Sequence, residues 1–150
     1  MKNQHQRTWL IQWCLLALAL LVAWPCFGKS TRSTSVRRSP KPSIVITRVP
    51  PPGAGENTWG QIAGQVRGVT RFQDYRVICY ALGDTYYVQP YANDCRISIS
   101  QSGGFELGTH LGYGYVCLLV KAGYQPPATT ATLPRVGGAI LAVAHATPKK

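Results

Sequence analysis

Side chains that could carry out a reaction are few and scattered in this sequence. Asp84, Asp94 and Glu106 lie near predicted turns, and His110 follows Thr109 in a stretch rich in glycine. A hydrolase needs a nucleophile or a pair of acids in contact with a group that orients them. The spacing brings no such set together, and we interpret His110 as a loop histidine that hydrogen-bonds backbone carbonyls. The sequence therefore predicts a protein that is not an enzyme.

Metal and cofactor sites are not indicated either. Beyond the N-terminal segment the histidines are His110 and His145, and we interpret His145 as a surface or edge residue of the last predicted strand. The sequence has neither a Cys-x-x-Cys nor a His-x-x-x-His spacing, which are typical of zinc sites. No glycine run precedes a predicted helix, as a phosphate-binding loop requires. We expect no metal ion and no cofactor.

The cysteines are better explained by oxidation than by catalysis. Cys14 and Cys26 belong to the N-terminal segment, which leaves Cys79, Cys95 and Cys117. In an oxidising compartment we expect one disulfide and one remaining thiol. Cys79 and Cys117 lie in two apolar runs that could be neighbouring strands or could face each other across the core, so we predict that they pair and that Cys95 is free. The alternative is three buried thiols that behave as small hydrophobic residues.

Aromatic residues are the remaining candidates for a functional site. Alternation along an extended strand places Tyr86 and Tyr87 on opposite faces, so at most one of them enters the core. An exposed tyrosine offers a flat apolar face and a hydroxyl group, which together suit stacking on a sugar or a peptide. Ordinary strand composition is the alternative explanation, because tyrosine favours sheets. The predicted ligand-binding residues are Tyr86, Tyr87, Gln89, Tyr91 and Tyr113.

Two neighbours of these tyrosines support the prediction. Gln89 alternates onto the same face as Tyr87 and can both donate and accept hydrogen bonds, which suits sugar hydroxyls or a peptide backbone. Pro90 ends the strand and fixes the following loop, so a ring at Tyr87 or Tyr91 has little entropy left to lose on binding. The predicted partner is a glycan, peptidoglycan or an envelope protein.

Short apolar runs separated by Gly, Pro, Asn and Asp fill the chain from Ile44 onward, with no sustained helical period. The run at residues 115–120 is apolar on both faces, which is typical of a strand in the middle of a sheet. Seven or eight short strands at this spacing predict an all-β fold, either a two-sheet antiparallel β-sandwich, which we favour, or a small barrel. The predicted strands are residues 43–49, 61–69, 74–82, 85–91, 95–100, 105–108, 115–120 and 139–146.

Three motifs rich in glycine and aromatic residues follow one another in this domain. They are Gly-x-Val-x-Gly at residues 64–68, Gly-Gly-Phe-x-Leu at residues 103–107 and Tyr-x-x-Leu-x-Val-x-x-Gly-Tyr at residues 115–124. Their order resembles transthyretin-like sandwich modules, such as the carboxypeptidase regulatory-like domains. The resemblance implies tight turns at the glycines and a core plug at Phe105. We expect three buried side chains in particular: Phe105, Leu118 and Val120.

A closer likeness covers residues 44–143. The segments YYVQPYAND, THLGYGYVCLLVKAGYQPPATTATLP and VGGAILAVA are similar to an accessory β-domain of exported and membrane-anchored bacterial proteins. That domain stands in some of them beside glycoside hydrolases or sensory regions, and its family has no assigned activity. The likeness therefore implies a β-fold and export, and it supplies no catalytic residue.

The first 28 residues have the order of a secretory signal peptide. Lys2 and Arg7 precede an apolar block at residues 9–24, and the small residues Cys26 and Gly28 follow it. We predict cleavage after Gly28 and a secreted or periplasmic protein. The alternative is an uncleaved membrane anchor, because more basic residues follow the block than precede it and positive charge tends to stay cytoplasmic.

The formal net charge is +11, but much of it lies outside the predicted domain. Residues 29–43 are rich in Ser, Thr, Arg and Pro and contain no acidic residue, so we predict a disordered basic linker. Residues 44–148, the predicted β-sandwich domain, are close to neutral, whereas a nucleic-acid-binding domain usually carries a basic stripe on its folded surface. We expect no nucleic-acid partner. The linker is either a solvated tether or makes a weak, salt-sensitive contact with an anionic envelope surface.

Together these features predict a non-enzymatic exported envelope protein. Its β-sandwich domain is expected to work as a binding or accessory module that recognises carbohydrate or peptide through the aromatic loop. The alternative is a purely structural envelope protein that acts through edge-strand pairing or self-association.

Overall fold

The computed structural model describes residues 40–55 and 57–149. The chain divides into two units, Met1–Arg37 and Arg38–Lys150, and every described residue belongs to the second unit. Residues 1–39, which hold the predicted signal peptide and most of the predicted linker, lie outside the described part. In the part that is described, no helix has the length and apolar character needed to cross a membrane.

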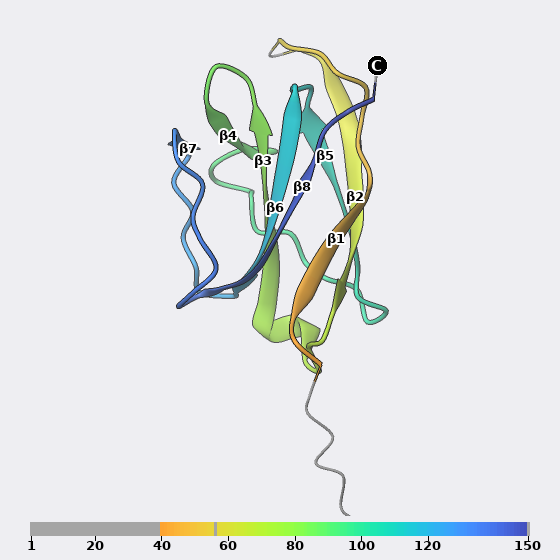
Figure 1. Ribbon diagram of the computed structural model, residues 1–150, viewed down its shortest axis with the longest axis vertical. Coiled ribbons are helices and arrows are strands. Elements are labelled where there is room, and N and C mark those ends of the chain that lie inside the picture. Colours follow the sequence, from red (N-terminus) through yellow and green to blue (C-terminus); the bar gives the residue numbers. More distant parts are fainter. Residues whose placement is uncertain (1–39, 56, 150) are drawn as a thin grey trace, which may run out of the picture. The chain divides into compact units, whose positions relative to one another are not determined.

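Two antiparallel sheets make up the described fold, which confirms the predicted all-β class (Figure 1). The three-stranded sheet has the order β1-β2-β5, and the five-stranded sheet has the order β7-β4-β3-β6-β8. A short 3₁₀ helix, Phe72–Asp74, precedes β3, and the two-residue strand β7 was not predicted. The strands are β1 (Ser43–Arg48), β2 (Trp59–Arg67), β3 (Tyr75–Leu82), β4 (Tyr86–Gln89), β5 (Gly104–His110), β6 (Gly114–Lys121), β7 (Thr129–Thr130) and β8 (Ile140–Ala146).

The five-stranded sheet is apolar on both faces at its centre, where β6 lies between β3 and β8 as its sequence predicts. Alternate residues of β6 enter two different hydrophobic clusters. One cluster, called the shared cluster from here on, takes residues from both sheets. It contains Ile62 and Phe105 of the three-stranded sheet together with Leu119 of β6. The other covers the opposite face and contains Leu118 and Val120. The predicted burial of Phe105, Leu118 and Val120 is therefore confirmed.

Phe105 reaches the shared cluster because its partner on β2 is a glycine. Gly64 stands directly opposite Phe105 in the β2–β5 register. A Cβ atom at residue 64 would overlap the Phe105 ring and the carbonyl oxygen of Val45. Glycine thus leaves the ring room to lie across β2 and to fill the space between the strands, at the cost of the packing that a side chain at residue 64 would give.

The predicted strand at residues 95–100 is wrong. This segment makes a single bridge to β3, in which Val77 and Ile97 exchange two backbone hydrogen bonds of 2.9 Å. Beyond the bridge the chain turns at Ser100, whose hydroxyl accepts the Gly104 N–H at 2.9 Å and whose own N–H donates to the Gly104 carbonyl. The extended segment ends at this turn, and its described pairing with β3 is the bridge at Ile97.

A disulfide joins Cys79 of β3 to Cys117 of β6, as predicted. The two residues stand directly opposite each other in the β3–β6 register, so the bridge ties neighbouring strands of one sheet. Cys95 is buried in the second cluster and is the free cysteine of the described residues. Burial raises the pKa of its thiol, which keeps the sulfur protonated and weakly reactive at neutral pH.

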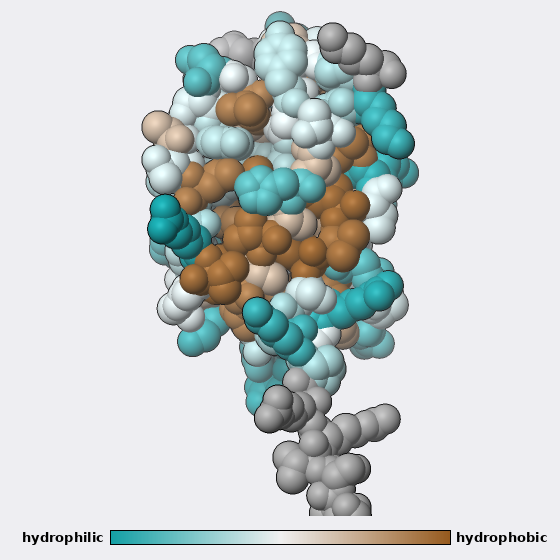
Figure 2. Space-filling view, viewed as in Figure 1, coloured by the Kyte–Doolittle hydropathy of each residue, from teal (hydrophilic) through white to brown (hydrophobic). Residues whose placement is uncertain are grey.

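One side of the molecule carries a band of apolar surface. β1 and β8 belong to different sheets and lie side by side (Figure 1). Figure 2 shows this side, with apolar surface across its middle and hydrophilic side chains above and below. Ile46 and Val49 from the β1 side and Leu141 and Ala144 from β8 pack on the cluster that joins the two sheets and are only partly buried. Apolar area is thus left in contact with water along the line where the two sheets meet.

Candidate functional site

A cavity of about 560 Å³ opens beside the end of β4. Four of the five predicted ligand-binding residues line it, namely Tyr87, Gln89, Tyr91 and Tyr113. The fifth, Tyr86, packs on the second cluster at the opposite face of β4, as the alternation of the strand requires. The other walls come from the β1–β2 loop, the β3–β4 turn, the end of β5 and the start of β7.

The cavity forms where the two sheets differ in width. β5 is the outermost strand of the three-stranded sheet, whereas the five-stranded sheet continues through β3 and β4 to β7. Tyr87 and Gln89 share one face of β4, and the last residues of β5 reach that face only at Gln89. The surface around Tyr87 has no further strand over it in the described part of the chain, so the space there stays open.

Gln89 joins β4 to the end of β5 at the base of the cavity. Its side chain is only 2% exposed, and its Oε1 accepts the backbone N–H of His110 at 2.9 Å. The Thr109 hydroxyl and the His110 Nδ1 lie 3.2 and 3.1 Å from the same oxygen, and the Gln89 Nε2 donates to the Tyr87 carbonyl at 3.2 Å. Gln89 was predicted to offer these groups to a ligand. The structure instead places them within the protein, where they join β4 to the end of β5.

These contacts also assign the proton of the His110 ring. A backbone N–H can only donate, so the Gln89 atom that faces His110 is the amide oxygen. An acceptor at 3.1 Å requires that Nδ1 carry the hydrogen, which leaves the lone pair of the neutral ring on Nε2. His110 therefore presents a hydrogen-bond acceptor beside the cavity.

The expectation that Thr109 and His110 lie in a loop is wrong, because they are the last two residues of β5. Thr109 is fully buried and pairs with Gly60 of β2, and His110 pairs with Trp59. His110 contacts a side-chain amide through its ring rather than capping backbone carbonyls. The strand continues this far because β2 starts at Trp59, two residues earlier than predicted.

Three aromatic rings form a cluster at the rim of the cavity. The Trp59 and His110 ring centroids are 4.0 Å apart, and Tyr91 meets both rings edge-on at 5.6 and 5.5 Å. Trp59 is 46% exposed and Tyr91 is 53% exposed, so each ring keeps a face for a ligand. Sequence reasoning missed Trp59, although an exposed tryptophan beside a predicted strand is the signal that could have found it.

Tyr87 is held at the surface by a charged neighbour. Its hydroxyl donates to the Asp84 carboxylate at 2.8 Å, across the β3–β4 turn. This hydrogen bond lowers the pKa of Asp84 and raises the pKa of Tyr87, because it stabilises the carboxylate and the neutral phenol. Asp84 is the one carboxylate among the described residues that line the cavity, and none of these residues is a lysine or an arginine.

Tyr115 fixes the backbone between β5 and β6. Its ring is buried, its hydroxyl accepts the Gly112 N–H at 2.8 Å, and the same hydroxyl lies 3.4 Å from the His110 carbonyl oxygen. Burial raises the pKa of this phenol. Tyr113 follows in the same segment and is held by a 2.9 Å hydrogen bond from its N–H to the Leu82 carbonyl, so its exposed ring projects from a fixed backbone.

The polar side chains of the site contact other groups of the protein and leave ring surface exposed beside them. Within residues 40–55 and 57–149, no three His, Cys, Asp or Glu side chains are grouped so that they could hold a metal ion. Asp84 and His110 line the same cavity, but their contacts are to Tyr87 and Gln89 and not to each other. What the cavity offers are ring faces, one carboxylate and the acceptor nitrogen of His110.

Comparison of the chain with protein-family models, with curated proteins and with solved structures finds no match. The likeness to transthyretin-like modules therefore stays a prediction from the motifs at residues 64–68, 103–107 and 115–124. The likeness to an accessory bacterial β-domain likewise stays a prediction from segments within residues 44–143.

Proposed function

We propose that the described unit is an immunoglobulin-like β-sandwich that works as a non-enzymatic, carbohydrate-binding module of an exported envelope protein. The sandwich is supported by the hydrophobic cluster that takes residues from both sheets. It is also supported by Tyr115, which stands at the start of β6, two residues before Cys117, and bonds back to Gly112. A tyrosine in this place is a recurrent feature of immunoglobulin-like domains.

The observation that carries the proposed activity is the set of exposed rings around the cavity. Tyr87, Tyr91 and Tyr113 each keep a large exposed area, although buried hydrogen bonds and turns fix the backbone on which they stand. Rings held in this way lose little conformational freedom when a ligand stacks on them. A purely structural domain has no need to hold such rings in water.

A glycan fits the cavity better than a charged ligand does. Among its described lining residues there is no lysine or arginine, and the Asp84 carboxylate is engaged with Tyr87. Sugar rings offer apolar faces for stacking and hydroxyls that both donate and accept, which suit the tyrosine hydroxyls and the acceptor nitrogen of His110. Peptidoglycan and other envelope polysaccharides are the polymers that an exported protein meets.

The test is retention of the full-length protein on insoluble peptidoglycan. We expect Tyr91→Ala to weaken binding at least about tenfold, which corresponds to about 1.4 kcal/mol. The melting temperature should change little, because substitution of an exposed residue usually shifts stability by no more than about 0.5 kcal/mol. Binding should also change little between low and high salt, since no lining cation is involved.

Two control variants make the result interpretable. Tyr91→Phe keeps the ring and should retain most of the affinity, and Val136→Ala removes an exposed apolar side chain that does not line the cavity. Unfolding of Tyr91→Ala would mean that the ring is part of the core. Wild-type protein that binds neither peptidoglycan nor a neutral polysaccharide would reject the proposed function.

Export is the second part of the proposal, and it rests on the N-terminal sequence. Mass spectrometry of the periplasmic or extracellular fraction should find a mature N-terminus at Lys29, because signal peptidase acts after small residues and Cys26 and Gly28 stand in the two positions that it reads. Recovery of the intact chain from Met1 in the membrane fraction would favour an uncleaved anchor instead.

The alternative function, self-association, is favoured by one observation. Figure 2 shows a band of apolar surface on the side where β1 and β8 lie next to each other, and Ile46, Val49, Leu141 and Ala144 are only partly buried. Contiguous apolar surface of this kind often marks an interface. Sedimentation equilibrium separates the two functions: a glycan-binding monomer supports the module, and a stable oligomer that retains no glycan supports the structural alternative.

A further inference from the structure

Trp59 does not line the cavity, and its position in the fold points away from it. Ile62, Gly64 and Val66 of β2 are buried against the shared cluster, so the odd-numbered residues of this strand face outward. Trp59 is the first of these outward residues, at the end of β2 nearest the cavity. It therefore stands where the rim of the cavity meets the outer face of the three-stranded sheet.

The indole of Trp59 lies against Gly108 on this outer face. A Cβ atom at Gly108, on the neighbouring strand β5, would be 3.7 Å from two carbons of the indole, which is ordinary van der Waals contact. The ring thus rests over Gly108 and beside His110, with centroids 4.0 Å apart. Nearly half of Trp59 remains exposed, so the supported ring keeps an open surface for stacking.

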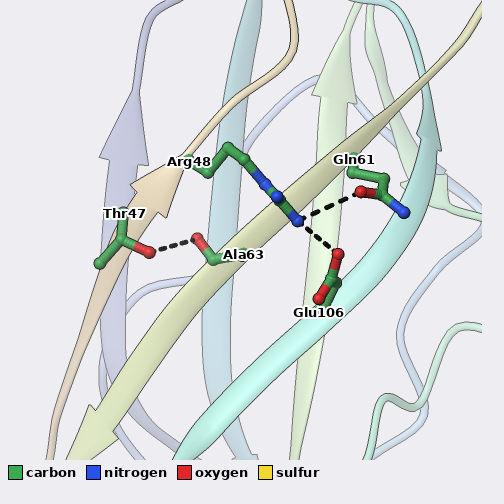
Figure 3. A network of polar contacts seen from close by, with 5 residues as sticks. All are labelled: Thr47, Arg48, Gln61, Ala63 and Glu106. Carbon is green, nitrogen blue, oxygen red and sulfur yellow. Dashed lines mark hydrogen bonds and ion pairs between the residues drawn. The ribbon is translucent and has the colours of Figure 1, made fainter.

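Polar side chains continue the same face beyond Trp59. Figure 3 shows Arg48 reaching across β2 to Gln61 and Glu106. The Arg48 guanidinium donates to the Gln61 Oε1 at 3.2 Å and pairs with the Glu106 carboxylate. The amide hydrogens of Gln61 and the second oxygen of Glu106 are groups that sugar hydroxyls can bond.

A β-bulge brings Arg48 to this face. The β1–β2 register shifts between Ile46 and Arg48, so that Thr47 and Arg48 together stand opposite Ala63. Without the extra residue, Arg48 would alternate onto the inward face with Ile44 and Ile46. The Thr47 hydroxyl donates to the Ala63 carbonyl at 3.2 Å and holds the bulge (Figure 3). Arg48 and Glu106 then neutralise each other, so the face is polar but carries little net charge.

We propose that the outer face of the three-stranded sheet, from Trp59 to Gln61 and Glu106, is a second binding stretch that continues the cavity and takes further sugar rings of a neutral polysaccharide. This inference rests on the proposed function and names its ligand as a polymer chain. From residue 59 to residue 63 a strand extends by about 13 Å. Gly108 has no side chain, so the surface beside the indole stays open to a ligand. The outer face and the cavity form one continuous site because Trp59 contacts both His110 and Tyr91 at the rim of the cavity.

The signature of such a site is an affinity that rises with ligand length. We expect the full-length protein to bind the six-ring β-1,4-linked N-acetylglucosamine oligomer at least about tenfold more tightly than the two-ring oligomer, as measured by titration calorimetry. Trp59→Ala should remove most of this gain. The fluorescence of Trp59, taken as the difference between wild-type and Trp59→Phe spectra, should change with the six-ring oligomer and hardly at all with the two-ring one.

A variant that leaves the cavity intact isolates the outer face. Gln61→Ala removes an exposed amide together with its hydrogen bond from Arg48. It should lower the affinity for the six-ring oligomer about threefold without changing that for the two-ring oligomer. Gln101→Ala, at an exposed turn on another part of the chain, is the matched control and should change neither affinity.

The outcomes separate the two proposals. Equal affinity for the two oligomers overturns the second stretch and leaves the cavity as the whole site. No binding to either oligomer, together with no retention on peptidoglycan or on a neutral polysaccharide, overturns the proposed function itself. Tight binding of a peptidoglycan stem peptide that is lost in Trp59→Ala overturns the assignment to sugar rings and makes this face a peptide site.

Discussion

Replacing Phe105 with alanine is expected to lower the free energy of unfolding by about 3–5 kcal/mol, the usual cost of truncating a core phenylalanine. The ring is 5% exposed and belongs to the cluster that joins the two sheets. It crosses β2 at Gly64, which has no side chain that could move in to fill the space. The void left by the ring should therefore persist, which places the expected loss in the upper part of this range. Urea denaturation with linear extrapolation measures the change.

The exposed neighbour Glu106 on the same strand is the control. Glu106→Ala loses only a surface ion pair with Arg48, which is worth at most about 1 kcal/mol. A loss of stability below about 1 kcal/mol in Phe105→Ala would show that the ring is not the core plug that the Gly-Gly-Phe motif implies.

Removing the disulfide should have an effect of similar size. The double variant Cys79→Ala/Cys117→Ala is expected to lose about 4 kcal/mol, because the bridge closes a loop with a sequence separation of 38 and so restricts the unfolded chain. Reducing agent should destabilise the wild-type protein by a comparable amount and leave the double variant unchanged. Peptide mapping without reduction should recover Cys79 linked to Cys117, with Cys95 alkylated only after denaturation. Three alkylatable thiols in denatured protein from its native compartment would contradict the bridge.

Much of the fold could be predicted because alternation and turn residues are local signals. The interior position of β6 in its sheet follows from its two apolar faces, and the burial of Phe105 follows from its motif. The segment at residues 95–100 alternates equally well, yet it finds a partner only at Val77. A segment forms a strand only where a neighbouring strand has a free edge to pair with. The alternation within the segment itself does not show whether such an edge exists.

Part of the candidate site could also be predicted, because alternation along a strand is a local signal. Alternation correctly separated Tyr86 from Tyr87 and put Gln89 on the face of Tyr87. It could not show that the end of β5 covers Gln89 and leaves Tyr87 open, because that depends on how many strands each sheet has. Trp59 was missed since its role comes from partners far away in sequence, Tyr91 and His110.

The bridge between β3 and β6 also determines how the protein would respond to a pulling force. If the domain holds a polymer, as proposed, while the rest of the chain is pulled, it carries mechanical load. The chain between Cys79 and Cys117 cannot be drawn out by that load, because the sulfur–sulfur bond carries the tension directly from one strand to the next. About 130 Å of extensible chain is thereby withheld until the bond is reduced. Oxidation thus shortens the length to which the unfolded domain can be drawn out.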